Sequence, residues 1–127
     1  MAEAEALIPR LSPLMSRLRE CHAEVGRLHT ALQEAQRRVV MAGGVRLDQE
    51  FWRSRKAALA RLTTEIRKRV GEVVSLGVVP KDLEMGLVDF PFLMGEREVN
   101  LCWRLGEREI RYWHGLDEGY AGRQPLP

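Results

Sequence analysis

The residue types best suited to chemistry are concentrated after residue 80, where one histidine lies among acidic and basic side chains. A histidine with several carboxylates could bind a metal ion or carry out acid–base catalysis. The residues concerned are Lys81, Asp82, Glu84, Asp89, His114, Asp117 and Arg123. Their spacing matches no metal-binding motif, so structural ion pairs are the favoured interpretation. A ligand patch is the alternative, and neither a metal nor a cofactor is predicted.

Trp113 and Cys102 are the other residues of interest in this region. Trp113 is expected on the polar face of a sheet, where an exposed tryptophan would mark a binding patch. The alternative is that the glycine-rich tail covers it. Cys102 has no base placed beside it and is not expected to be a nucleophile. The candidate ligand patch therefore consists of Trp113 and the seven polar residues named above.

A second candidate surface is basic and lies between residues 53 and 69. This segment, RSRKAALARLTTEIRKR, contains seven basic residues and one acid, Glu65. On a helical wheel, five of the cations face away from the apolar stripe: Arg53, Lys56, Arg61, Arg67 and Lys68. Such a face could bind a phosphate backbone. A solvated outer face is the favoured interpretation, because no aromatic residue interleaves with these charges.

The composition limits the classes of protein to consider. The chain has 127 residues, of which 45% are hydrophobic and 30% charged, which is typical of one folded domain. No apolar run is long enough for a membrane helix, and the N-terminal MAEAEALIPRL lacks the features of a signal peptide. We therefore expect a cytoplasmic protein in which Cys21 and Cys102 are reduced.

Arginine is strongly preferred to lysine. The chain has 17 Arg and 3 Lys, with one Asn and four Gln. Few thermolabile amides are typical of thermophilic proteins, although GC-rich codon usage produces the same bias.

Residues 7–39 carry the clearest periodic pattern. Apolar residues are spaced alternately by four and three positions: Leu7, Leu11, Leu14, Leu18, Cys21, Val25, Leu28, Leu32, Ala35 and Val39. This period predicts a long helix with a coiled-coil seam. Pro9 and Pro13 predict a kink or a start near Ser12, and Gly43-Gly44 is expected to end the helix. A third apolar stripe, with Ile8 and Met15, fades along the helix, so another element should pack near its start.

A second helix is predicted from the N-cap Asp48 to a stop at Leu76-Gly77. The short connection predicts that residues 1–77 form an antiparallel helical hairpin. Residues 78–127 should then pack at its open end, over Ile8 and Met15, within one structural domain. Beyond that contact the hairpin should protrude.

The second part of the chain contains a repeat with an offset of eleven residues. MGEREVNLCW (94–103) matches LGEREIRYWH (105–114), which predicts two turns and a three-stranded antiparallel meander. The first turn pairs Val88 with Trp103 and Phe90 with Leu101. The second turn, expected to be the wider one, pairs Leu101 with Tyr112 and Arg104 with Glu109. In this register Asp89 and His114 lie on opposite faces. Residues 78–83 are a further candidate strand, and the tail from Gly115 is expected to be irregular.

Several segments resemble a known family. They are LIPRLSPLM (7–15), KDLEMGLVDFP (81–91), NLCWRLGE (100–107) and YWHGLDEGYAGRQP (112–125). They are similar to an uncharacterised family of small prokaryotic proteins that constitutes a domain of unknown function. The resemblance implies no activity, cofactor or catalytic residue.

The sequence thus predicts an α+β domain with a long helical hairpin, a small antiparallel meander and an irregular tail. The favoured function is a non-enzymatic interaction or scaffolding module. It should form homodimers through its helices, because Val40, Phe51 and Trp52 exceed what two facing helices can bury. The alternatives are nucleic-acid binding through the basic face, and a small-ligand binder or enzyme that uses the candidate ligand patch.

Overall fold

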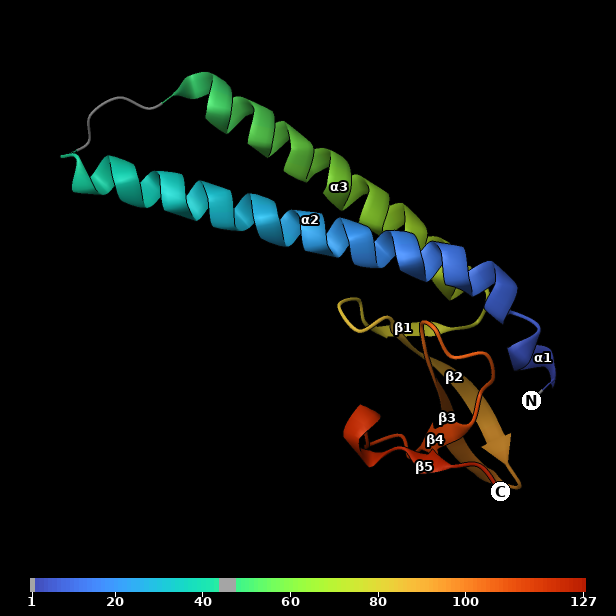
Figure 1. The fold of residues 1–127 in the computed structure, drawn as a ribbon. Coiled ribbons are helices and arrows are strands. Elements are labelled where there is room, and N and C mark those ends of the chain that lie inside the picture. The colour runs from blue at the N-terminus through green and yellow to red at the C-terminus, as the bar shows by residue number, and fades with distance from the viewer. Residues whose placement is uncertain (1, 44–47) are drawn as a thin grey trace.

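The computed structural model describes residues 2–43 and 48–127. Within these ranges two long helices precede a five-stranded antiparallel sheet (Figure 1). The elements are α1 (Ala2–Glu5), α2 (Ile8–Met41), α3 (Gln49–Ser75), β1 (Val79–Asp82), β2 (Leu87–Met94), β3 (Arg97–Arg104), β4 (Tyr112–His114), the 3₁₀ helix η1 (Tyr120–Gly122) and β5 (Gln124–Pro125). The predicted α+β class and the helical hairpin are confirmed, whereas the sheet has five strands instead of three.

Helix α2 follows the heptad pattern from Ile8 onward and does not begin near Ser12. Pro9 lies in the first turn, where a missing N–H costs nothing. The helix then continues through Pro13 to Met41, and Gly43 follows with a φ of 74°. The predicted stop is therefore observed at Gly43, while Gly44 lies outside the described residues.

Helix α3 begins and ends as its sequence predicts. The Oδ1 atom of Asp48 accepts hydrogen bonds from the N–H groups of Glu50 and Phe51, at 3.1 and 3.2 Å. At the other end Gly77 adopts a φ of 83°, a left-handed conformation that glycine takes without steric cost. The chain then leaves the helix and enters β1.

The strand order in the sheet is the order in the sequence, β1-β2-β3-β4-β5. The predicted register between β2 and β3 is confirmed, with Val88 opposite Trp103 and Phe90 opposite Leu101. Strand β1 confirms the candidate strand, with Val79 opposite Asp89. The two edge strands are short, and each contains a proline, Pro80 or Pro125.

The predicted register between β3 and β4 is wrong by one residue. Leu101 lies opposite Trp113 instead of Tyr112, and Asn100 lies opposite His114. The repeat suggested a turn of four residues, but the connection between the two strands contains residues 105–111. Because side chains alternate between the faces of a sheet, the one-residue shift moves His114 to the face that carries Asp89.

The same shift changes two further contacts. Arg104 does not pair with Glu109, which binds Arg111 at 3.2 Å instead. Tyr112 lies on the face of Cys102, so it does not join the core. The tail also differs from the prediction, because its residues Gln124 and Pro125 pair with β4 as a fifth strand.

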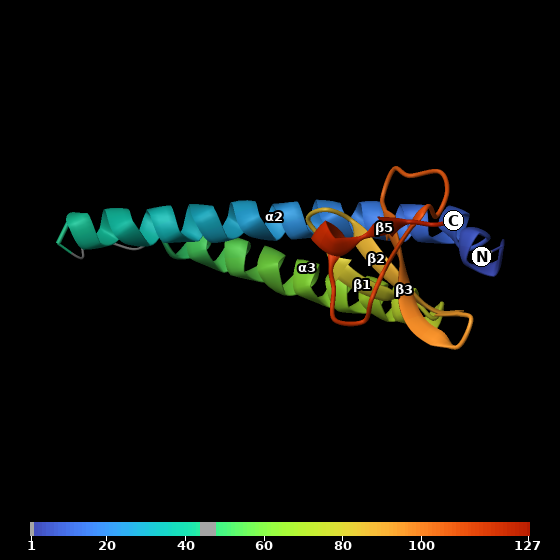
Figure 2. The same cartoon turned by 90° about the horizontal axis from the view of Figure 1, so that it is seen from below.

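The core lies between one face of the sheet and the open end of the hairpin. The sheet and the β3–β4 connection contribute Val88, Phe90, Leu101, Trp103 and Ile110, while the helices contribute Leu11, Met15, Leu18 and Val73. Beyond Cys21 the described part of α2 has no buried residue. Figures 1 and 2 show the remainder of the hairpin extending past the sheet, as predicted.

One ion pair joins the two helices near the end of this core. The Nε and Nη2 atoms of Arg17 donate to the two carboxylate oxygens of Glu65, at 2.5 and 2.7 Å. This bidentate contact lowers the pKa of Glu65 to about 2.

The position of the core predicts unequal effects of leucine truncation along α2. Leu18→Ala should lower the free energy of unfolding by about 2–5 kcal/mol, because Leu18 is fully buried. The matched variant Leu28→Ala should have a clearly smaller effect, since Leu28 is only half-buried. Urea unfolding at low protein concentration measures both. Equal losses would contradict a core confined to the open end.

The Arg17–Glu65 pair predicts a pH-dependent contribution to stability. Because the pKa of Glu65 is lowered on folding, the contribution is present above the ordinary value of 4.5 and is lost as the pH falls towards about 2. Glu65→Gln should therefore destabilise the protein at neutral pH, and this effect should become progressively smaller as the pH falls through about 2. Thermal unfolding across this range measures the difference. Glu24→Gln, which removes an exposed pair within α2, should have a smaller effect throughout.

Candidate functional site

A cavity of about 300 Å³ lies on the face of the sheet that does not contact the helices. The strands contribute Lys81 and Asp82 from β1, Leu87 and Asp89 from β2, Cys102 from β3 and His114 from β4. The connecting segments contribute Met85, Glu118 and Gly119, and η1 contributes Tyr120. We call this the β-sheet cavity. It contains four residues of the candidate ligand patch: Lys81, Asp82, Asp89 and His114.

The centre of the cavity wall is a buried pair formed by His114 and Asp89. The His114 Nε2 atom lies 2.9 Å from Oδ1 of Asp89, and both residues are only 2% exposed. The other ring nitrogen, Nδ1, lies 2.8 Å from the carbonyl oxygen of Gly115. Both nitrogens thus face acceptors. Burial acts to lower the pKa of His114, but the Gly115 carbonyl and the Asp89 carboxylate outweigh it and raise the pKa above 6.5.

The second carboxylate oxygen of Asp89 is buried and accepts no hydrogen bond from the described residues. The Nζ atom of Lys81 lies 4.0 Å from this oxygen, which is too far for a hydrogen bond. A buried oxygen without a partner costs free energy. This atom is therefore the least satisfied polar group of the cavity.

Cys102 lies beside this pair. Its sulfur and one ligand atom each of Asp89 and His114 all lie within 4.8 Å of one another. Burial raises the pKa of the Cys102 thiol, and the Asp89 carboxylate raises it further, against the opposing effect of Arg123. These effects favour the neutral thiol near pH 7 in the free protein. The expectation that no base lies beside Cys102 is wrong, because a ring nitrogen of His114 lies within 4.8 Å of its sulfur.

Asp82 has a structural role at the edge of the cavity. Its Oδ1 atom accepts a hydrogen bond from the Met85 N–H at 2.9 Å, which closes the turn between β1 and β2. Gly86 completes this turn with a φ of 72°, and a Cβ atom there would lie 2.7 Å from the Cβ atom of Leu105. Glycine is therefore required both by conformation and by space.

Arg123 holds the tail against the sheet and does not line the cavity. Its guanidinium carbon lies 3.9 Å from the ring centroid of Tyr112 and 4.3 Å from that of Tyr120. It also donates to the Glu107 carboxylate, at 3.3 Å from each oxygen. Arg123 thus fixes Tyr120, which forms part of the cavity wall.

The remaining residues of the candidate ligand patch lie elsewhere. Glu84 and Asp117 are exposed and do not line the cavity. Trp113 is not on the polar face, because the shifted register places it opposite Leu101, where it packs against the core. Arg97 covers part of it, with its guanidinium carbon 5.3 Å from the ring centroid. Sequence reasoning missed Cys102, Glu118 and Tyr120 as cavity residues, although the β2–β3 pairing had placed Cys102 opposite Asp89.

The five cations of the basic face are all exposed on α3: Arg53, Lys56, Arg61, Arg67 and Lys68. Arg53 lies 3.6 Å from Glu50. No acidic partner lies within ion-pair distance of the other four in the described ranges. The face is therefore free of local neutralisation along most of its length.

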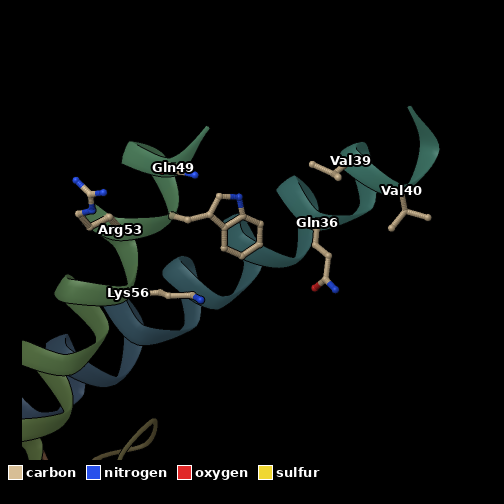
Figure 3. A pocket seen from close by; sticks show the side chains of 7 residues that line it. Gln36, Val39, Val40, Gln49, Arg53 and Lys56 are labelled. Atoms are coloured by element: carbon tan, nitrogen blue, oxygen red, sulfur yellow. The ribbon is translucent and has the colours of Figure 1, made fainter. Parts of the chain in front are cut away.

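A groove of about 660 Å³ lies between α2 and α3 near the closed end of the hairpin. It is lined by Gln36, Val39, Val40, Gln49, Trp52, Arg53 and Lys56, and we call it the tip groove. Figure 3 shows Val39 pointing from α2 towards α3 and Lys56 extending from α3 towards α2, while Arg53 points away. Val40 and Met41 are 69% and 82% exposed, so this end of the hairpin presents apolar surface to solvent.

The chain is thus a small α+β protein in which a protruding helical hairpin is joined to an antiparallel sheet with a polar cavity. Residues 1–126 match the model of a family described as an uncharacterized conserved protein, DUF2203. The chain belongs to this family, which confirms the resemblance noted in the sequence. Neither curated proteins nor solved structures gave a match. Among the described helices, none is long and apolar enough to cross a membrane.

The geometry predicts that Asp89 controls the protonation of His114. Asp89→Asn should lower the pKa of His114, because a neutral amide replaces the carboxylate that stabilises the imidazolium. NMR titration of the histidine ring protons in chelator-treated buffer measures this change. Asp117→Asn, an exposed control in the following loop, should leave the titration as in the wild type. An unchanged pKa in Asp89→Asn would contradict the paired geometry.

Proposed function

We propose that the protein is an interaction module that associates with a second copy of itself through the distal half of its helical hairpin. The observation that carries this proposal is the tip groove with its exposed apolar rim. The module would act in the cytoplasm, where its two free cysteines, Cys21 and Cys102, stay reduced.

The first support is the mismatch between the sequence pattern and the burial of α2. The apolar seam continues with the same spacing to Val39, but Cys21 is the last buried residue in the described part of the helix. Val25, Leu28 and Leu32 are only half-buried by α3. A seam of this kind is typical of helices that pack against further helices. The sheet cannot cover this part of the seam, because it packs against the opposite end of the hairpin.

The second support is the self-complementarity that symmetry provides. A twofold axis along the hairpin would place the seam of one copy against the same seam of the other, as in an isologous dimer. Two hairpins would then form a four-helix bundle. Burial of several side chains such as Val39, Val40 and Trp52 contributes several kcal/mol at about 25 cal/mol per Å², before the cost of association.

The charges beside the groove are compatible with such a contact. Its lining contains two cations and no acid, but both cations have long aliphatic stems. Such side chains can cover apolar surface while the charged group stays in water. Lys56 already contacts the apolar wall of the groove, because its Nζ atom lies over the Trp52 ring, 5.7 Å from the centroid.

Matched valine substitutions on the two helices test this proposal. Val40→Glu should weaken self-association at least about tenfold, because it places a charge in the apolar contact. Val74→Glu is the control, since Val74 is 54% exposed on α3 at the sheet end. Both positions are exposed, so neither change should unfold the monomer. Sedimentation or light scattering over a dilution series gives the mass.

The expected wild-type result is a dimer that dissociates on dilution, with Val74→Glu behaving in the same way. A monomeric wild-type protein at all concentrations, or an equally stable dimer of Val40→Glu, would contradict the proposal. In the first case, a foreign partner helix becomes the better explanation for the tip groove.

Nucleic-acid binding through the five exposed cations of α3 is the second candidate. It is favoured by the lack of acidic partners for four of them among the described residues. Binding to a labelled duplex should then fall steeply with salt and be weakened by the double variant Arg61→Glu/Lys68→Glu. For the third alternative, an enzyme or small-ligand binder, the relevant residues are those of the β-sheet cavity.

A further inference from the structure

We propose that Asp89, Cys102 and His114 form a binding site for a divalent transition-metal ion of the zinc type. This inference is independent of the proposed self-association, because the three residues lie in the sheet, whereas the proposed dimer contact lies at the distal end of the hairpin.

The donor set fits such an ion. The three residues offer a carboxylate oxygen, a thiolate sulfur and an imidazole nitrogen, which are the ligands that zinc takes in proteins. One atom from each lies within 4.8 Å of the others, and all three side chains are buried. A tetrahedral ion with bonds of about 2.0–2.3 Å holds its ligand atoms roughly 3.3–3.8 Å apart. Small side-chain shifts would therefore close the site around a metal.

The three ligands lie on neighbouring strands of the sheet. Asp89 on β2 is directly opposite Cys102 on β3, and His114 follows on β4, next to Asn100. Each strand contributes one ligand, so the three are separated by 13 and 12 positions in the chain. This separation explains why the sequence contains no familiar metal-binding spacing.

The orientation of His114 is that of a metal ligand. Its Nδ1 atom can donate to the Gly115 carbonyl at 2.8 Å, which leaves the lone pair of Nε2 directed towards Asp89. Histidines that bind metals usually donate their other N–H group to a carbonyl or carboxylate in this way. The Nε2 atom lies within hydrogen-bond distance of Asp89 Oδ1, so a metal ion would bind it after loss of any proton on that nitrogen, with Oδ2 of Asp89 available to the same ion.

A second observation points to a ligand independently of this donor set. The Oδ2 atom of Asp89, a residue that lines the cavity, is buried and accepts no hydrogen bond from the described residues. A native fold seldom leaves a buried carboxylate oxygen without a partner. A cation bound by Asp89 would satisfy it, and Lys81 at 4.0 Å is too distant to do so.

The cavity supplies the fourth coordination position. Three protein ligands with an open position are typical of zinc sites that bind water or an exogenous ligand. The β-sheet cavity, about 300 Å³, provides room for that ligand. The positive charge of Lys81 opposes cation binding, but its side chain is exposed and can move away.

Cobalt(II) titration of the full-length, chelator-treated protein tests the site. The wild type should bind one equivalent and develop the near-ultraviolet charge-transfer absorption of a cobalt–thiolate bond. Cys102→Ser should abolish this absorption. Cys21→Ser is the matched control, because it makes the same change at the other free, buried cysteine, on α2; it should retain the absorption.

Zinc competition and a second variant complete the experiment. Zinc should displace cobalt, and Asp89→Asn should weaken cobalt binding at least about tenfold while circular dichroism shows an intact fold. Absence of the thiolate absorption in the wild type would overturn the proposal. So would its persistence in Cys102→Ser, or unchanged affinity in Asp89→Asn. None of these outcomes affects the association of hairpins, which is measured separately.

Discussion

A hydrogen bond from the indole of Trp103 to the carbonyl of Glu107, at 2.9 Å, fixes the connection on which the cavity depends. Trp103 is fully buried, so the connection is tied to the core instead of extending into solvent. The Glu107 carboxylate adds two further contacts, because it accepts from the Arg104 N–H and from Arg123. One residue thus joins the end of β3, the core and the tail. The length and path of this connection, residues 105–111, set the register of β4, which places His114 beside Asp89.

The features that could be predicted from the sequence are local or strongly periodic. The caps at Asp48 and Gly77 need only a few neighbouring residues, and the helical seam repeats over many turns. The register of β2 and β3 was predictable because a tight turn at Gly95 leaves little freedom between the two strands. In each case, the residues that interact are close together in the sequence or recur at a regular spacing.

The second register could not be predicted for a physical reason. The repeat around Gly106 resembles the first turn in sequence, but residues 105–107 are held by contacts that the repeat does not reveal. The Trp103 indole donates to the Glu107 carbonyl, the Arg104 N–H donates to the Glu107 carboxylate, and the Leu105 N–H donates to the Gly86 carbonyl. The observed register differs from the predicted one by a single residue. This difference places Trp113 against the core instead of on the polar face, and it places His114 beside Asp89. The candidate site therefore depended on the least predictable step of the fold, while four of its residues were identified by their chemistry alone.

The prolines of the two edge strands have a consequence for the behaviour of the sheet. Exposed sheet edges can recruit strands from other molecules, which leads to aggregation. Here one edge strand is four residues long and the other two, and Pro80 and Pro125 each remove an N–H donor from them. Each of these two strands is therefore a poor template for an added strand. The outermost strands thereby oppose edge-to-edge growth of the sheet, even though its strands do not form a barrel.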